Sequence, residues 1–130
     1  MFENTYRNKR VLVTGHTGFK GSWLSMWLIN LGAEVIGYSK DVPSNPSHFE
    51  KLNLENRISH YFGDVCDFIE LKNICEKENP EIIFHLAAQP IVMASYEEPL
   101  ETFRSNTLGT MNVAEVCRVV PSVKGCVFIT

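Results

Sequence analysis

Three glycines spaced three residues apart, Gly15, Gly18 and Gly21, are the residues whose type and spacing point most directly to chemistry. They follow three apolar β-formers, Val11–Val13, and precede a helical pattern, so the order is strand, glycine turn and helix. Gly15 would let the chain turn sharply, Gly18 would let backbone approach a phosphate, and Gly21 would let the helix pack close to the strand. The first N–H groups of the helix would face the phosphates. The pattern predicts a site for the pyrophosphate of a dinucleotide.

The spacing G-x-x-G-x-x-G departs from the more familiar G-x-G-x-x-G, so a glycine-rich turn without a ligand is the alternative. The strand directly before the turn favours the binding site. Two further residues flank the loop. His16 follows the first glycine, and Lys20 could add positive charge beside the pyrophosphate or lie solvated in water.

Polar residues follow the second and third expected strands. Ser39 and Lys40 come roughly 20 residues after the glycines, where such folds carry a carboxylate for the ribose of NAD or an arginine for the 2′-phosphate of NADP. The sequence has neither at that point, and cofactor choice stays open. Lys40 is a cation and Asp41 follows it, and the alternative is that both are solvated loop residues. Asp64 could accept a hydrogen bond from an adenine amino group, or could be a turn residue. Asp67 already fills the role of a helix cap, with Glu70 three residues on, which favours a ligand for Asp64.

Small residues follow the fourth expected strand, in the sequence Leu86-Ala87-Ala88-Gln89. The small side chains of the two alanines would leave space for a cofactor to cross the edge of the sheet. The alternative is that they only allow tight packing within the protein. His85, at the end of that strand, is interpreted as a core histidine rather than a catalytic one.

Composition restricts the class of protein. The chain has 130 residues, of which 45% are hydrophobic and 21% charged, with a net charge of −3. These values indicate one globular domain, and without a basic cluster we expect no nucleic-acid partner. No apolar run reaches the roughly 18 residues of a membrane span, and the N-terminus lacks the apolar core of a signal peptide. We therefore expect a cytoplasmic protein without a membrane partner. The four cysteines form no C-x-x-C pair, which predicts reduced thiols and no metal site; they are Cys66, Cys75, Cys117 and Cys126.

Apolar runs and helical patterns alternate along the chain. The first helix is expected to end at Gly32 and to bury one apolar face made of Trp23, Leu24, Trp27, Leu28 and Leu31. Later helices are expected at residues 48–56, 67–78 and 99–119, with close backbone packing at Gly109. Strands are expected at residues 11–13, 33–38, 58–62, 81–86 and 124–130. The alternation predicts an α/β fold, a Rossmann-type parallel sheet of order 3-2-1-4-5 with the cofactor across the carboxyl ends of its strands.

Five segments together carry a resemblance to a known family. On these segments the sequence resembles the extended short-chain dehydrogenases/reductases, and more narrowly their CDP-glucose 4,6-dehydratase branch. The segments are Thr14-Gly-His-Thr-Gly-Phe-Lys-Gly-Ser-Trp-Leu24, Gly63-Asp-Val-Cys-Asp67, Phe84-His-Leu-Ala-Ala-Gln-Pro90, Ser95-Tyr96 and Glu101-Thr-Phe-Arg-Ser-Asn-Thr-Leu-Gly-Thr110.

The resemblance implies bound NAD, a homo-oligomer and a nucleotide-sugar substrate, CDP-glucose. In such enzymes a Tyr-x-x-x-Lys pair helps to oxidise C4 of the glucose, water is lost across C5 and C6, and the hydride returns to C6. Gln89 and Pro90 would face the sugar, and Asn106 would hold neighbouring loops. Carried over by position, the cofactor-binding residues would be Gly15, Gly18, Phe19, Lys20, Gly21, Ser39, Lys40, Asp64, Val65, Leu86, Ala87, Ala88 and Ser105.

The sequence departs from the family in one respect, because it contains no Tyr-x-x-x-Lys. Tyr6, Tyr38, Tyr61 and Tyr96 are followed four residues later by Arg10, Val42, Val65 and Leu100. The family's catalytic segment would begin after Thr130, so residues 1–130 correspond to a partial NAD-binding domain, and we expect this chain alone to be inactive. Two alternatives remain open, a nucleotide-sugar epimerase of the same family and a non-catalytic NAD(P)-binding sensor.

Overall fold

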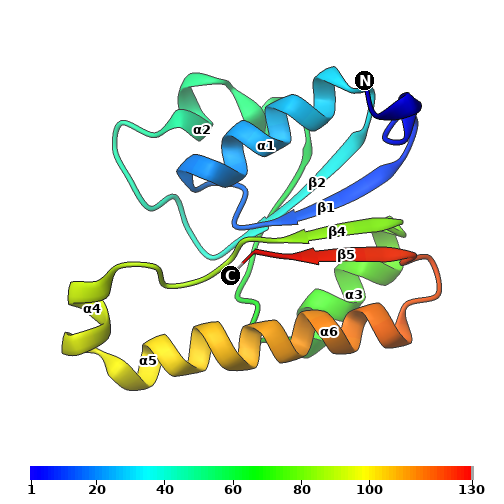
Figure 1. Ribbon diagram of the computed structural model, residues 1–130. Coiled ribbons are helices and arrows are strands. Elements are labelled where there is room, and N and C mark those ends of the chain that lie inside the picture. The colour runs from blue at the N-terminus through cyan, green and yellow to red at the C-terminus, as the bar shows by residue number, and fades with distance from the viewer. Residues whose placement is uncertain (130) are drawn as a thin grey trace.

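The fold is known from a computed structural model that describes residues 1–129. All strand pairs are parallel and form one sheet of order β3-β2-β1-β4-β5, so the predicted topology is confirmed (Figure 1). The strands are β1 (Arg10–Thr14), β2 (Glu34–Ser39), β3 (Ser59–Phe62), β4 (Ile82–His85) and β5 (Gly125–Phe128).

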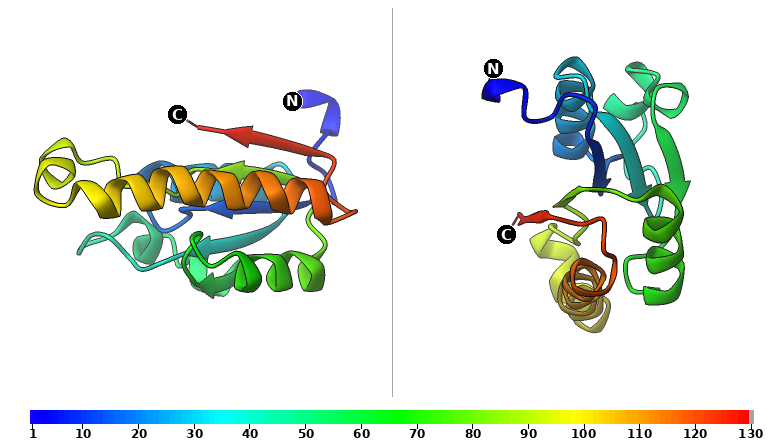
Figure 2. Two further views of the ribbon diagram at one scale, coloured as in Figure 1. Left: turned by 90° about the horizontal axis from the view of Figure 1, so that it is seen from below. Right: turned by 90° about the vertical axis from the view of Figure 1, so that its right-hand side faces the viewer.

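Helices cover both faces of the sheet. In Figures 1 and 2, α1 and α2 lie on one face, α3 and α6 lie on the other, and α4 and α5 project beyond the carboxyl ends of the strands. The helices are α1 (Phe19–Asn30), α2 (His48–Lys51), α3 (Phe68–Glu78), α4 (Val92–Glu97), α5 (Pro99–Phe103) and α6 (Gly109–Val119). Short 3-10 turns lie at Phe2–Asn4 and Leu54–Asn56, and a π-helical turn at Arg104–Leu108 joins α5 to α6.

The central strand β1 divides the core between the two faces. Its side chains alternate, because successive residues of a strand point to opposite faces. Val11 and Val13 pack with Leu28 of α1, whereas Leu12 belongs to the larger cluster on the α3 and α6 side. All three β1 residues are buried, as expected for a strand covered on both faces.

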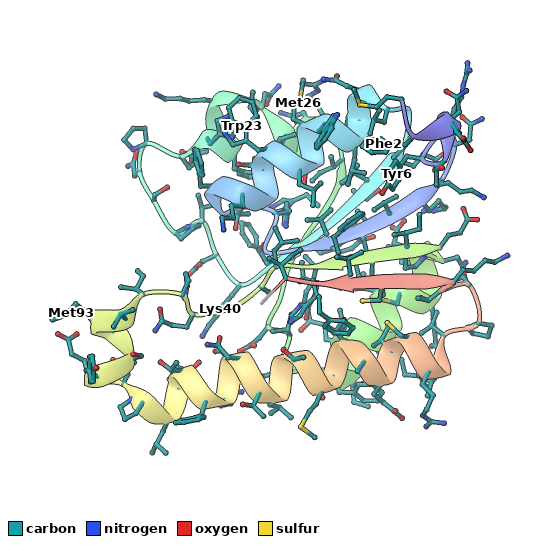
Figure 3. All side chains as sticks on the ribbon, in the orientation of Figure 1. Phe2, Tyr6, Trp23, Met26, Lys40 and Met93 are labelled. Atoms are coloured by element: carbon teal, nitrogen blue, oxygen red, sulfur yellow. The ribbon has the colours of Figure 1, made fainter. Side chains whose placement is uncertain are left out.

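The prediction for the buried face of α1 was wrong for its two tryptophans and is confirmed for Leu28, which is buried in the core with Leu24 packed against it. Trp23 and Trp27 are 54% and 49% exposed, and Figure 3 shows Trp23 on the outer side of the helix. Besides Leu28, the buried residues of α1 are Gly21, Ser22 and Ser25. The start of the helix lies in contact with the glycine loop, because a Cβ at Gly21 would overlap the Gly15 carbonyl oxygen, so the first turns bury small side chains and the tryptophans lie on the outside. Trp23 stacks there on His48, with ring centroids 4.4 Å apart.

Other boundaries differ modestly from the prediction. The segment 48–56 divides into α2 and a 3-10 turn, and α4 was not predicted. The expected helix 99–119 is interrupted by the π-helical turn, after which Gly109 packs as predicted: a Cβ there would lie 2.6 Å from Val65 Cγ2. Asp67 caps α3 as predicted, because its side chain accepts a hydrogen bond from the Glu70 N–H at 3.0 Å.

Candidate functional site

The glycine loop between β1 and α1 has the geometry that the spacing predicts. Gly15 has a positive φ of 74°, and a Cβ there would lie 2.9 Å from the Ala87 backbone nitrogen. A Cβ at Gly21 would overlap the Gly15 carbonyl oxygen, so helix and turn are in contact. A Cβ at Gly18, in contrast, would meet only the Gly15 oxygen, at 3.4 Å. Two glycines are therefore required by packing, whereas Gly18 faces open space where a ligand could approach.

The start of α1 offers backbone donors at the same place. Gly18 is the N-cap residue and has no side chain to satisfy the first N–H groups of the helix. Phe19 and Lys20 are exposed in this first turn, and no acidic residue lies there. The partial positive charge of a helix N-terminus is thus left for an anion, which suits a pyrophosphate.

The end of β4 lies directly against the glycine loop. Thr14 Oγ1 accepts hydrogen bonds from the N–H groups of Leu86 and Ala87, each at 3.1 Å, and lies 2.7 Å from His85 Nδ1. His85 is buried, as predicted for a core histidine, and burial lowers its pKa to about 4. Thr14 was given no role from the sequence, although its place at the end of β1 could have indicated one.

Ser39 at the end of β2 is buried rather than solvated. Its Oγ lies 2.9 Å from His16 Nδ1 and 3.4 Å from the Thr17 backbone nitrogen. Lys40 is exposed and lies among the carboxyl ends of the strands (Figure 3).

Four charged side chains form an ion network at this edge of the sheet. Lys40 Nζ lies 4.0 Å from Asp64 Oδ2 and 3.6 Å from Glu101 Oε1. Arg104 Nη1 lies 3.5 Å from the same Asp64 oxygen and 3.6 Å from the same Glu101 oxygen. Ser105 Oγ also donates to Glu101, at 3.2 Å. Arg104 was not predicted to belong to the site, because nothing in the sequence shows that residues 40, 64 and 104 meet.

Asp64 is held in its ionised form. Burial by itself would raise the pKa of this carboxyl, but hydrogen bonding by Cys66 and the charges of Lys40 and Arg104 outweigh it and lower the pKa below its usual value. The Cys66 N–H donates to Asp64 Oδ1 at 2.8 Å. The neighbouring Val65 is fixed by Asn112, whose Nδ2 donates to the Val65 carbonyl at 2.9 Å.

The segment after β4 is closed by Gln89 and Asn106. The Gln89 N–H donates to Asn106 Oδ1 at 2.7 Å, and Asn106 Nδ2 donates to the Gln89 carbonyl at 3.1 Å. Asn106 thus ties the segment after β4 to the π-helical turn, in keeping with the holding role that the resemblance implies. The Gln89 side chain forms hydrogen bonds of 2.7–3.0 Å with the backbone of Ile91, and its Nε2 donates to Thr102 Oγ1 of α5 at 3.2 Å.

None of the four tyrosines is placed as a base paired with a lysine at this edge. Tyr38 is buried and its hydroxyl donates to the Asp64 carbonyl, while Tyr61 bonds to Glu78. Tyr6 packs on Phe84, and Tyr96 in α4 is 80% exposed. Within residues 1–129, no cluster of His, Cys, Asp or Glu could hold a metal ion. No helix in that range is long and apolar enough to span a membrane.

The structure brings the predicted residues to one edge of the sheet, in the order of the strands. The glycine loop and Phe19–Gly21 follow β1, Ser39 and Lys40 follow β2, and Asp64 and Val65 follow β3. Leu86–Ala88 follow β4, and Ser105 reaches the edge from the π-helical turn. Their contacts with a cofactor remain predictions.

Known proteins with similar sequences include sugar-nucleotide dehydratases. A family profile described as GDP-mannose 4,6 dehydratase matches residues 12–130. The CDP-glucose 4,6-dehydratase of Salmonella typhimurium is 48% identical over 128 residues, which cover 98% of this chain and 36% of that protein. The chain thus spans about a third of the length of this relative.

Solved structures also match. The epimerase Mth375 of Methanothermobacter thermautotrophicus has a TM-score of 0.83 and 34% identity, covering 96% of this chain and 36% of that protein. The UDP-glucose 4-epimerase of Brucella ovis, solved in complex with NAD, has a TM-score of 0.78 and 28% identity over 92% of this chain and 35% of that one. Since the family profile matches nearly the whole length, the chain belongs to the GDP-mannose 4,6 dehydratase family.

Proposed function

We propose that this chain is the NAD-binding part of a sugar-nucleotide 4,6-dehydratase that converts CDP-glucose to CDP-4-keto-6-deoxyglucose. The observation that carries the proposal is the glycine loop, in which packing requires Gly15 and Gly21 while Gly18 faces open space. The choice of CDP-glucose rests on the 48% identity to the Salmonella CDP-glucose 4,6-dehydratase.

The residues present fit a bound NAD. The first N–H groups of α1 and the open side of Gly18 would hold the pyrophosphate. Asp64, kept ionised by its neighbours, would accept a hydrogen bond from the adenine amino group. Ala87 and Ala88 would leave room for the nicotinamide half beyond β4. NAD supplies a hydride acceptor when bound, and these residues bind and orient it.

The ion network supports NAD rather than NADP. Lys40 and Arg104 are two cations, but Asp64 and Glu101 are two carboxylates within 4.0 Å of them. The cluster is therefore close to neutral, and a 2′-phosphate with about two negative charges would meet no net positive field.

A second candidate is a nucleotide-sugar 4-epimerase. The specific observation in its favour is that the UDP-glucose 4-epimerases match this fold well, with a TM-score of 0.82 for the Thermotoga maritima protein. A third candidate function is that of a non-catalytic NAD(P)-binding sensor.

The test is an assay of the full-length protein with CDP-glucose, UDP-glucose, dTDP-glucose and GDP-mannose, followed by NMR of the product. A 4-keto-6-deoxy sugar formed fastest from CDP-glucose is the expected result. Inversion at C4 without loss of water would instead establish the epimerase, and NAD binding without turnover of any sugar would establish the sensor.

A further inference from the structure

His16, the residue between Gly15 and Thr17 of the glycine loop, points back into the protein. Its side chain is fully buried. Gly37 of β2 lies directly beneath it, because a Cβ at Gly37 would overlap the His16 ring. Phe49 of α2 packs against the ring edge-on, with centroids 5.3 Å apart. A polar side chain buried this deeply needs hydrogen-bond partners.

Both ring nitrogens of His16 have such partners. Nδ1 lies 2.9 Å from Ser39 Oγ at the end of β2, and Nε2 lies 2.7 Å from His60 Nδ1 in β3. The glycine loop is therefore tied to two strands of the sheet through one side chain. The partners stand 23 and 44 residues away along the chain.

The directions of these hydrogen bonds follow from His60. Its Nε2 is buried and has no partner among residues 1–129. A buried N–H without an acceptor is costly, so we assign the bare lone pair to Nε2 and the proton to Nδ1. His60 then donates to His16 Nε2, and His16 donates from Nδ1 to Ser39. Both rings are neutral in this arrangement, in keeping with burial, which lowers the pKa of each.

The rest of the loop is held from the same side. The Gly15 N–H donates to the Tyr38 carbonyl at 2.9 Å, and Thr17 Oγ1 donates to the Asp41 carbonyl at 2.6 Å. Residues 15–17 are thus fixed from behind by β2 and its following loop. Gly18 and the exposed Phe19 and Lys20 lie in front, on the side proposed to receive the pyrophosphate.

We propose that His60 is a positioning residue for the cofactor, which fixes the glycine loop through His16 in the conformation that accepts a pyrophosphate. The inference rests on the proposed dinucleotide site. It assigns a role in binding to a residue of β3 whose side chain lies against His16, Phe49 and Phe62.

Two substitutions of His60 separate positioning from packing. His60→Phe retains an aromatic ring beside Phe49 and Phe62 but cannot donate to His16. His60→Asn keeps an N–H near the place of Nδ1. In the full-length protein, NAD affinity is measured by calorimetry well below the melting temperature, and amide hydrogen exchange is measured for Thr17 and Gly18. Leu71→Ala, which empties a fully buried position in α3, is the control for lost stability alone.

We expect His60→Phe to weaken NAD binding about tenfold, as displaced binding groups do, and to speed exchange of the loop amides. His60→Asn should stay near the wild type in both measurements, and Leu71→Ala should melt earlier with unchanged NAD affinity. Wild-type affinity and exchange in His60→Phe, or equal losses in Phe and Asn, would overturn the proposal. If the wild-type protein binds no NAD, the proposed function fails, and the exchange rates alone decide whether His60 holds the loop.

Discussion

The hydroxyl of Thr14 and the imidazole of His85 are joined by a hydrogen bond of 2.7 Å that links the ends of β1 and β4 beneath the glycine loop. Because Thr14 Oγ1 already accepts from two backbone N–H groups, its own proton must go to His85 Nδ1. His85 Nε2 then donates to Thr110, 3.3 Å away, and Thr110 donates to the Asn106 carbonyl at 2.7 Å. In this series of hydrogen bonds, every donor and acceptor has a partner only while His85 is neutral.

The protein should therefore lose stability in mild acid. Burial lowers the pKa of His85 to about 4 and that of His16 to about 3 from 6.5, so below pH 6.5 the unfolded chain binds more protons than the native one. Their contribution is complete above pH 6.5 and is lost as pH falls toward these folded-state values. Each histidine adds up to about 1.4 kcal/mol per pH unit to the slope of the unfolding free energy against pH. Urea unfolding at several pH values between 7.5 and 5 measures this slope. His85→Gln should remove the contribution of one histidine to this slope. An unchanged slope in this variant would contradict a buried, neutral His85.

Gly18→Val should abolish NAD binding without unfolding the protein. The added side chain would occupy the open space in front of the loop, where the pyrophosphate is proposed to lie. Gly125→Val is the matched control, because a Cβ at Gly125 has nothing within 4 Å and the residue lies in β5. Calorimetric titration with NAD compares the two variants at equal concentration. Retained affinity in Gly18→Val would remove the argument from the glycine loop.

NAD should bind more tightly than NADP, and Glu101→Gln should narrow the difference. Removing one of the two carboxylates near Lys40 and Arg104 leaves the cluster with a net positive charge that attracts a 2′-phosphate. These side chains are partly exposed, so the gain for NADP relative to NAD is about threefold to tenfold, and less at high salt. Titrations of the wild type and of Glu101→Gln with both cofactors, at two ionic strengths, measure the affinity for NADP relative to NAD. A clear preference of the wild type for NADP would contradict the proposed cofactor.

The 130-residue chain should self-associate when it is produced by itself. Strand β5 pairs only with β4 among residues 1–129, and Val127, Phe128 and Ile129 are 43%, 38% and 45% exposed. An apolar strand with a free edge is a template for pairing with another copy. Light scattering from micromolar to near-millimolar concentration measures it, and Val127→Lys should reduce the association. A clean monomer over that range is the contrary result.

The same chain should not turn over CDP-glucose. Removal of a proton from the 4-hydroxyl needs a positioned base, and none of the four tyrosines has a lysine four residues later. Losing a general base costs about a hundredfold to ten-thousandfold in rate, and loss of sugar positioning adds to this. The assay incubates the chain with NAD and CDP-glucose for a long time and then measures the absorbance of the 4-keto product in alkali. The Salmonella enzyme serves as positive control. Product above a no-protein blank that disappears in Gly18→Val would show that further catalytic groups exist here.

The sequence by itself determined the fold class and the strand order. Apolar runs and helical patterns are local signals, and their strict alternation permits few topologies besides a parallel sheet with right-handed crossovers. The roles of Gly15 and Gly21 were also predictable, because a sharp turn and a close helix start are properties of the loop itself. The cap at Asp67 follows in the same way, because it joins residues three positions apart.

The tertiary structure alone decided which residues meet at the carboxyl edge of the sheet and which way their side chains point. The apolar pattern of α1 predicted buried tryptophans, but the first turns of the helix bury the small residues Gly21, Ser22 and Ser25 instead. The pairing of His16 with His60 and the approach of Arg104 to Asp64 join residues 44 and 40 positions apart. Such contacts depend on how whole strands and helices pack, and no local pattern in the chain encodes them.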